Sequence, residues 1–245
     1  MEAAEGAAVV VLGSRRWLMR DYDGKTAAER IAERRERLID AGVELFGDRG
    51  YAATSIRSVL SQSGLRDRYF GESFADLDSL LAAVYSRLVD EEVSGCAAAI
   101  DKTSGGSEGA RAMIDAITRS YEKNPGKARI KSREVLSGGP VAHEQRRAGL
   151  RRLAQLVADL LPPSTAVNSS DVLLLGLSIV AAADELLMAW IDGPEGLTRD
   201  RVVDVVMLMF DATAHHISSL EGRPRGERGS TGDQRAKRPG RATLK

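Results

Sequence analysis

Apolar residues recur at helical spacing along most of the chain. After Thr26, the residues Leu38, Ile39, Val43 and Phe46 lie three or four positions apart, which places them on one face of a helix. Alternation typical of strands is scarce, and residues with strong helix propensity dominate. The predicted fold class is therefore all-α.

Short helices separated by turns are predicted in the N-terminal third. Asp48-Arg49-Gly50 ends the first helix, with Gly50 suited to a left-handed cap. Thr54 is expected to cap and open a second helix, and Ser63-Gly64 is a turn. A third helix runs from about residue 66 to 73, and Asp76 caps a long fourth one. This order predicts a tri-helical helix-turn-helix, whose expected small core comprises Leu38, Val43, Phe46, Ile56, Leu60, Leu65, Phe70 and Phe74.

Longer helices fill the rest of the chain. Gly- and Pro-rich breaks at 103–107, 125–126, 138–140 and 162–163 separate amphipathic stretches. Two apolar helices, 171–191 and 198–220, close the fold. The predicted organisation is a flexible N-terminal arm (1–25), a helix-turn-helix domain (26–75), a helical effector-binding and dimerisation domain (76–221), and a disordered basic tail (222–245).

Charge is balanced overall but uneven along the chain. The formal net charge is zero. The tail from residue 222 has eight Lys or Arg against two acidic residues, a net charge of +6. Arg15, Arg16 and Arg20 form a basic N-terminal arm suited to a minor groove. Nucleic-acid binding therefore remains open, because it depends on where charges lie.

Cysteine content and apolar segments favour a soluble cytoplasmic protein. The single cysteine, Cys96, cannot form an internal disulfide and is expected to be a small packed residue rather than a redox sensor. The N-terminal apolar run is too short for a convincing signal peptide. The apolar stretch 172–191 reaches spanning length but contains Asp184 and Glu185, so we interpret it as a buried helix and expect no membrane association.

One segment resembles a known family closely. The run AGVELFGDRGYAATSIRSV is similar to the start of a TetR-family DNA-binding domain, and the similarity continues without a gap over about a fifth of the chain. Its matching positions are Ala41, Leu45-Phe46, Gly50-Tyr51, Thr54-Ser55, Ser63-Gly64-Leu65, Phe70, Phe74 and Leu80-Leu81.

The sequence departs from the family pattern in its recognition helix. Arg66-Asp67-Arg68 replaces the usual small start, Gly71 replaces a frequent tyrosine, and Leu77 replaces a phosphate-anchoring lysine. RDRYFGESF is interpreted as a variant recognition helix, and the operator sequence cannot be predicted from it.

Candidate DNA contacts follow from position. A helix N-terminus attracts phosphate, and the exposed first turns of a recognition helix reach base edges. The predicted phosphate contacts are Thr54, Ser55, Arg57 and Ser73, and the predicted base contacts are Arg66, Asp67, Arg68 and Tyr69. Glu72 is expected to pair with a neighbouring arginine rather than with cytosine.

The resemblance also implies a regulatory mechanism. A homodimer through the last two helices would bind a near-palindromic operator, and a small apolar effector in the middle helices would release it, as in a repressor. The candidate ligand-binding residues are Met113, Ile117, Tyr121, Leu153, Met188 and Trp190. Asp184 and Glu185 are either exposed at a helix edge or a polar anchor in the cavity.

Two other classes of protein are alternatives to a regulator. An enzyme is disfavoured because the sequence shows no nucleophile–base pair, phosphate loop or metal spacing, and no cofactor is expected. The three histidines, His143, His215 and His216, lack chelating geometry. A helical interaction protein with a degenerate DNA-binding head is supported only by Gly71 and Leu77.

Overall fold

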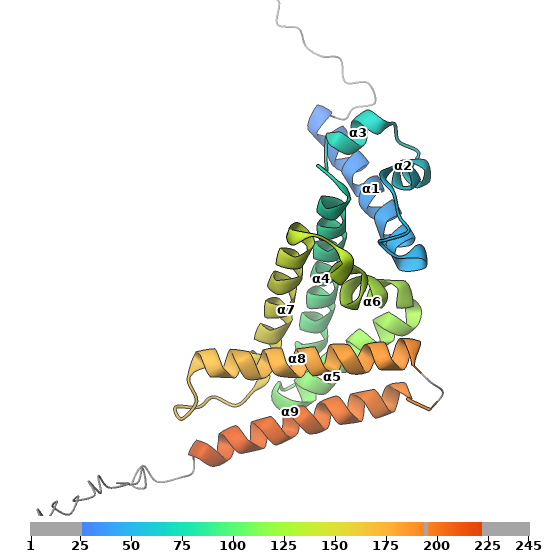
Figure 1. The fold of residues 1–245 in the computed structure, drawn as a ribbon. Helices are drawn as coiled ribbons and strands as arrows, with labels where there is room; N and C mark the ends of the chain where they lie inside the picture. Colours follow the sequence, from blue (N-terminus) through green and yellow to red (C-terminus); the bar gives the residue numbers. More distant parts are fainter. Residues whose placement is uncertain (1–25, 194–195, 222–245) are drawn as a thin grey trace, which may run out of the picture.

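Helices alone make up the regular structure of the part described. The structure is a computed structural model that describes residues 26–193 and 196–221. Within these ranges there is no strand, which confirms the all-α prediction (Figure 1). The predicted N-terminal arm and basic tail lie outside the described residues. The elements are α1 (Ala27–Arg49), α2 (Ile56–Ser63), α3 (Asp67–Gly71), α4 (Leu77–Ile100), α5 (Gly106–Lys123), α6 (Pro125–Ser132), the 3-10 helix η2 (Glu134–Ser137), α7 (Pro140–Leu160), α8 (Ser169–Asp192) and α9 (Arg199–Glu221).

Local capping sets several of these boundaries. Thr26 and Glu29 form a capping box at the start of α1, and Asp76 caps α4 as predicted. Gly64 is left-handed, with a φ of 64°, and makes the turn between α2 and α3. The prediction that Thr54 opens the second helix is wrong by one residue, since the N-cap is Ser55, whose Oγ accepts the Ser58 N–H.

A small apolar core holds α1, α2 and α3 together at one end of the molecule (Figure 1). Five of the eight predicted core residues are buried, namely Leu38, Phe46, Leu60, Phe70 and Phe74, and Val43 and Leu65 are partly buried. Ile56 is 38% exposed, so its predicted inward orientation is wrong. Val59 and Leu60 are the buried apolar residues of α2.

Helix α4 connects this head to the rest of the molecule. A Cβ on Gly42 of α1 would lie 2.8 Å from Val84 Cγ2, so the missing side chain lets α1 and α4 approach closely. The head core continues along α4 as far as Val89 and takes in Ile130 and Val135. The domain boundary after residue 75 stays a prediction.

The remaining helices form a larger body around a second core. The body contains α5, α7, α8 and α9, which contribute most of its buried Leu, Ile, Val and Met side chains. Asp78 on α4 accepts the Gly139 and Ala142 N–H groups at 2.6 and 3.3 Å, which caps α7 from a neighbouring helix. A negative charge at this helix N-terminus joins α4 firmly to α7.

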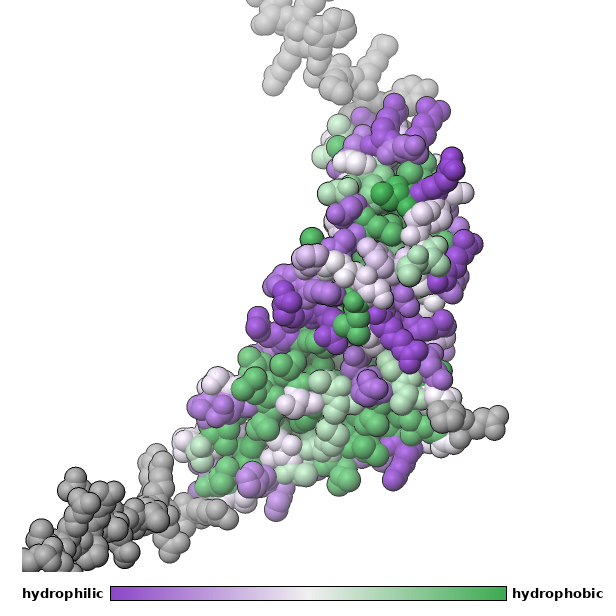
Figure 2. Space-filling view, viewed as in Figure 1, coloured by the Kyte–Doolittle hydropathy of each residue, from purple (hydrophilic) through white to green (hydrophobic). Residues whose placement is uncertain are grey.

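Helix α8 is only partly covered. By length and composition it is the one described helix that meets the criteria for a membrane span, a test that core helices of soluble proteins also pass. Ile179, Leu187 and Met188 are buried, whereas Leu174 is 58% exposed, so the prediction of a buried helix holds for one face. Figure 2 shows a broad apolar surface over the α8 and α9 end of the molecule.

Candidate nucleic-acid interface and internal cavity

Helix α3 is a short exposed rod anchored by aromatic side chains. Phe70 is buried beneath it, with its ring centroid 5.8 Å from that of Phe74. Arg66, Asp67 and Arg68 are exposed, and Arg66 precedes the helix in extended backbone. The first turn of α3 therefore points away from the molecule, as a recognition helix requires.

Tyr69 lies between two arginines on this surface. The guanidinium carbons of Arg34 and Arg68 lie 4.4 and 4.6 Å from its ring centroid. Arg68 Nη2 donates a hydrogen bond of 2.6 Å to the phenol oxygen, which lowers the pKa of Tyr69. Arg34 also binds Glu72 at 2.8 Å, which confirms the prediction that Glu72 pairs with an arginine.

The predicted phosphate contacts differ in accessibility. Ser55 and Arg57 are exposed at the start of α2. Thr54 is buried, and its hydroxyl donates to the Gly50 carbonyl oxygen at 2.8 Å, so it is not available to a phosphate in this conformation. Ser73 Oγ is likewise enclosed and has no partner within the described ranges.

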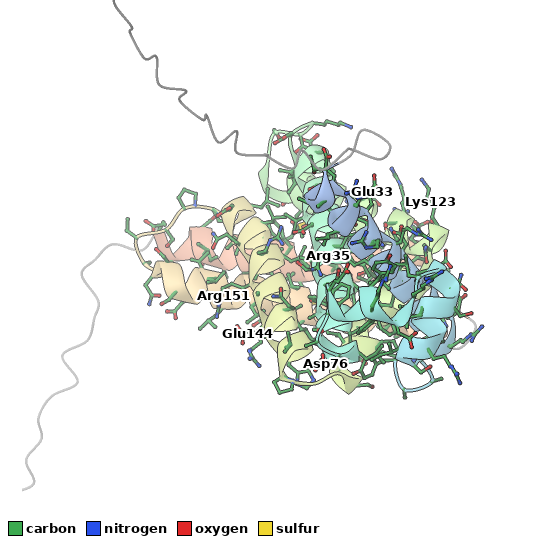
Figure 3. The ribbon with its side chains drawn as sticks, turned by 90° about the horizontal axis from the view of Figure 1, so that it is seen from above. Glu33, Arg35, Asp76, Lys123, Glu144 and Arg151 are labelled. Atoms are coloured by element: carbon green, nitrogen blue, oxygen red, sulfur yellow. The ribbon has the colours of Figure 1, made fainter. Side chains whose placement is uncertain are left out.

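Arginines on α1 brace the other two helices, a role that the sequence interpretation missed. Arg35 stacks over the Phe74 ring at 4.5 Å and donates to the Ser73 carbonyl at 3.2 Å. Arg37 donates to the Ser63 carbonyl at 2.5 Å, at the end of α2. Figure 3, seen from the head end, labels Glu33 and Arg35 on α1. The only signal in the sequence was the cluster of arginines before the apolar face, which is equally typical of a solvated helix surface.

An internal cavity lies in the body, between α4, α5, α7, α8 and α9. It comprises about 730 Å³ of space free of protein atoms, a volume that includes space open to solvent. Most of the lining is apolar and includes Ala110, Met113, Ile114, Ile117, Leu150, Leu153, Val157, Ile179, Val180, Ala183, Leu187, Val206, Met207 and Phe210.

Four of the six predicted ligand-binding residues line this cavity, namely Met113, Ile117, Tyr121 and Leu153. Met188 and Trp190 are not among the lining residues; Met188 is buried in the core and Trp190 packs against it. Leu187 lines the cavity, and the next residue along an α-helix points about 100° away. The placement of Met188 and Trp190 on the cavity wall is therefore wrong.

A buried ionic cluster forms one polar part of the lining. Lys131 on α6 pairs with Glu92 on α4, and both side chains are more than nine-tenths buried. The Tyr121 hydroxyl donates to Glu92 Oε2 at 3.2 Å and accepts from Lys131 Nζ at 3.1 Å. Burial raises the pKa of Tyr121 well above its ordinary value, so the phenol stays neutral. The sequence did not show this cluster, since nothing distinguishes Glu92 from the exposed Glu91.

Asp184 forms the second polar part. It lines the cavity and accepts a hydrogen bond from the Ser132 hydroxyl, whereas Glu185 is exposed. Of the two interpretations of this pair, a polar group in the cavity therefore describes Asp184, and an exposed helix edge describes Glu185.

Helix α6 reaches the cavity, and α6 and η2 both contact the head. Lys131 lines the cavity, and the neighbouring Ser132 donates a hydrogen bond to Asp184, which also lines it. At the other end, a Cβ on Gly47 of α1 would lie 3.2 Å from Gly126 Cα. Glu134 Oε2 accepts the Tyr51 N–H at 2.6 Å. A displacement of α6 would therefore change its contacts with the head.

Within residues 26–193 and 196–221, no group of three His, Cys, Asp or Glu side chains is placed to share a metal ion. Cys96 is buried, as expected for a packed residue.

A three-helix head with an exposed third helix, joined by α4 to a helical body with an internal cavity, is the fold of the TetR-family transcriptional regulators. No protein-family model matches the chain. The chain is 23% identical to the HTH-type transcriptional activator FasR of Mycolicibacterium smegmatis over 172 residues, which cover 70% of this chain and 78% of FasR.

Solved structures show the same fold. A Syntrophomonas wolfei protein described as a TetR-family transcriptional regulator has a TM-score of 0.60 at 17% identity, covering 75% of this chain and 96% of that one. The regulator FadR of Bacillus subtilis, solved with stearoyl-CoA, has a TM-score of 0.59 at 14% identity, covering 70% and 97%. These relatives are transcriptional regulators, a class of protein distinct from enzymes.

Proposed function

We propose that this protein is a sequence-specific DNA-binding transcriptional regulator of the cytoplasm, without catalytic activity, whose DNA affinity changes when a small apolar ligand enters the cavity. The observation that carries this proposal is α3, an exposed helix with Arg66 as its N-cap residue, with Arg68 and Tyr69 in its first turn, and with Phe70 anchoring it in the core. The major groove is about 12 Å wide and admits one such helix.

The apolar surface of α8 and α9 supports a homodimer. Leu174 on α8 and Leu208 on α9 are 58% and 70% exposed, which is costly for large apolar side chains left in water. Two copies joined there present two α3 helices to one duplex. The matching operator is near-palindromic, with half-sites about one helical turn, or roughly 34–36 Å, apart.

The contacts of α6 suggest how a ligand changes DNA affinity. A ligand that binds near Lys131 and Ser132 and favours another position of α6 would move Gly126 against Gly47 of α1. The dimer would then favour a different spacing of its two heads, and differential ligand affinity for the two spacings drives the change.

We expect ligand-induced release of a repressor. FasR is described as an activator, so the direction of regulation needs its own test. A reporter fused to a bound promoter should gain expression when the gene for this protein is deleted. Lower expression in the deletion strain would instead show activation.

The test of DNA binding starts with genome-wide mapping of bound sites. Gel-shift assays on a mapped site should then show that Arg66→Ala and Tyr69→Ala abolish sequence preference, since a bidentate arginine–guanine contact contributes roughly 1–3 kcal/mol of discrimination. Arg111→Ala is the matched control, because Arg111 is an exposed arginine of the body. Equal loss in all three variants would contradict the assignment of α3.

The second candidate is a helical interaction protein with a degenerate head. The departures at Gly71 and Leu77 favour it, because these two residues replace a tyrosine and a phosphate-anchoring lysine of the family pattern. A regulator that contacts phosphates must lose DNA affinity steeply with salt. If the dimer shows no salt-dependent binding to any mapped or upstream duplex, this second function is the correct one.

A further inference from the structure

The formal charges of the residues that line the cavity do not cancel. Glu92 and Asp184 are acidic and Lys131 is basic, so two negative charges minus one positive charge leave a formal charge of −1 in the lining. All three lie in a cavity whose other walls are mainly aliphatic and aromatic. The position of this excess negative charge therefore influences which ligands the cavity binds.

The positive charge of Lys131 is already paired with the carboxylate of Glu92. Its ammonium pairs with Glu92, and the Tyr121 hydroxyl bonds to both groups, at 3.1 Å from Nζ and 3.2 Å from the carboxylate. With Lys131 and Glu92 both more than nine-tenths buried, a ligand anion must displace Glu92 to reach Lys131 and leave that carboxylate buried without a partner. The cluster consequently presents no free positive charge.

Asp184 is not matched by a cation. Among the described residues its one hydrogen bond comes from the Ser132 hydroxyl, which is neutral. Arg146 lies near the Tyr85 hydroxyl, which donates to the Arg146 carbonyl oxygen at 3.4 Å, but Arg146 is not part of the lining. Burial is the main cause that raises the pKa of Tyr121 and of Tyr85; the negative charges of Glu92 and Asp184 raise both further, whereas the positive charge of Arg146 lowers the pKa of Tyr85. A carboxylate beside apolar walls gains most from a positively charged partner.

We propose that the ligand is an amphipathic organic cation, with a protonated amine paired to Asp184 and an apolar body packed against Met113, Leu153 and Phe210. This inference rests on the proposed ligand-binding role of the cavity and specifies the chemistry of its ligand. An amphipathic anion of the same size gains the same apolar contacts but places its charge next to Asp184. The cavity therefore discriminates by charge as well as by size.

Three probes with the same alkyl chain test this on the full chain: decylammonium, decanol and decanoate, below their micellar concentrations. Isothermal titration should rank their affinities in that order. Asp184→Asn should weaken decylammonium binding about tenfold or more, the usual effect of losing a charge-assisted hydrogen bond, and leave decanol binding unchanged. Asp184→Glu keeps the charge and should keep the preference for the cation.

Glu185→Gln is the matched control, because Glu185 is the adjacent carboxylate and is exposed. Tighter binding of decanoate than of decylammonium by the unmodified chain overturns the inference, and so does an equal loss in the Asp184→Asn and Glu185→Gln variants. Gel-shift assays without ligand separate the two proposals. DNA binding with no preference for the cation rejects the ligand class alone, whereas cation binding by a chain that ignores DNA rejects the regulatory function alone.

Discussion

Cys96 shows how one side chain's surroundings determine its chemistry. Burial on α4 raises the pKa of its thiol to about 12. Only the thiolate is an efficient nucleophile, so the group stays protonated and unreactive at all pH values well below that value. We expect iodoacetamide to label Cys96 slowly at pH 8 in the folded protein and rapidly in denaturant, with mass spectrometry as the readout. Rapid labelling of the folded protein would show that the α4–α5 packing opens readily.

Gly71 offers a second test at this scale. It is the last residue of α3, and a Cβ there would meet nothing within 4 Å. Gly71→Ala should therefore raise the free energy of unfolding by about 0.5–1 kcal/mol, because glycine loses more backbone freedom on folding. Chemical denaturation measures this effect. Unchanged DNA affinity in the same variant would confirm that the departure from the family's tyrosine leaves the recognition surface intact.

Close approach between α7 and α8 depends on one glycine. A Cβ on Gly176 would lie 2.5 Å from the Ala154 carbonyl oxygen, a backbone atom that cannot move aside cheaply. Gly176→Ala should lower the free energy of unfolding by about 1–3 kcal/mol, as overpacking usually does. Gly95→Ala is the control, because a Cβ on this α4 glycine meets nothing within 4 Å and should be neutral or stabilising. Similar effects of the two substitutions would argue against the tight helix contact.

Elements proved easier to predict than the directions of single side chains. Thr26 and Asp76 cap their helices through bonds to residues three positions away, so the local sequence contains the whole signal. Thr54 and Ser55 are both good caps, and the choice between them depends on the bond from Thr54 to Gly50. Likewise, Leu187 lines the cavity and Met188 does not. This difference depends on how α8 is rotated about its axis against α7, and tertiary packing rather than local sequence determines that rotation. The Glu92–Lys131 pair joins residues 39 positions apart, beyond the range of any local pattern.

The molecule carries many hydrophilic side chains on the head and a broad apolar surface at the α8 and α9 end (Figure 2). If α8 and α9 form the dimer interface, Leu174→Asp combined with Leu208→Asp should convert the dimer to a monomer, because two buried charges then oppose association. Light scattering after size exclusion measures the mass. Leu136→Asp is the control, since Leu136 is 53% exposed on η2 and lies outside that face. A dimer that survives the double substitution must use another surface.

The contact between Gly47 and Gly126 has a consequence for evolution of the response. Backbone meets backbone there, with no side chain to cushion a shift. Enlarging either glycine by a single methyl group would act as a wedge, setting the tilt of the head before any effector arrives. If the proposed coupling through α6 holds, a single codon change at either glycine would fix the response to the ligand while leaving the cavity and the recognition helix unchanged.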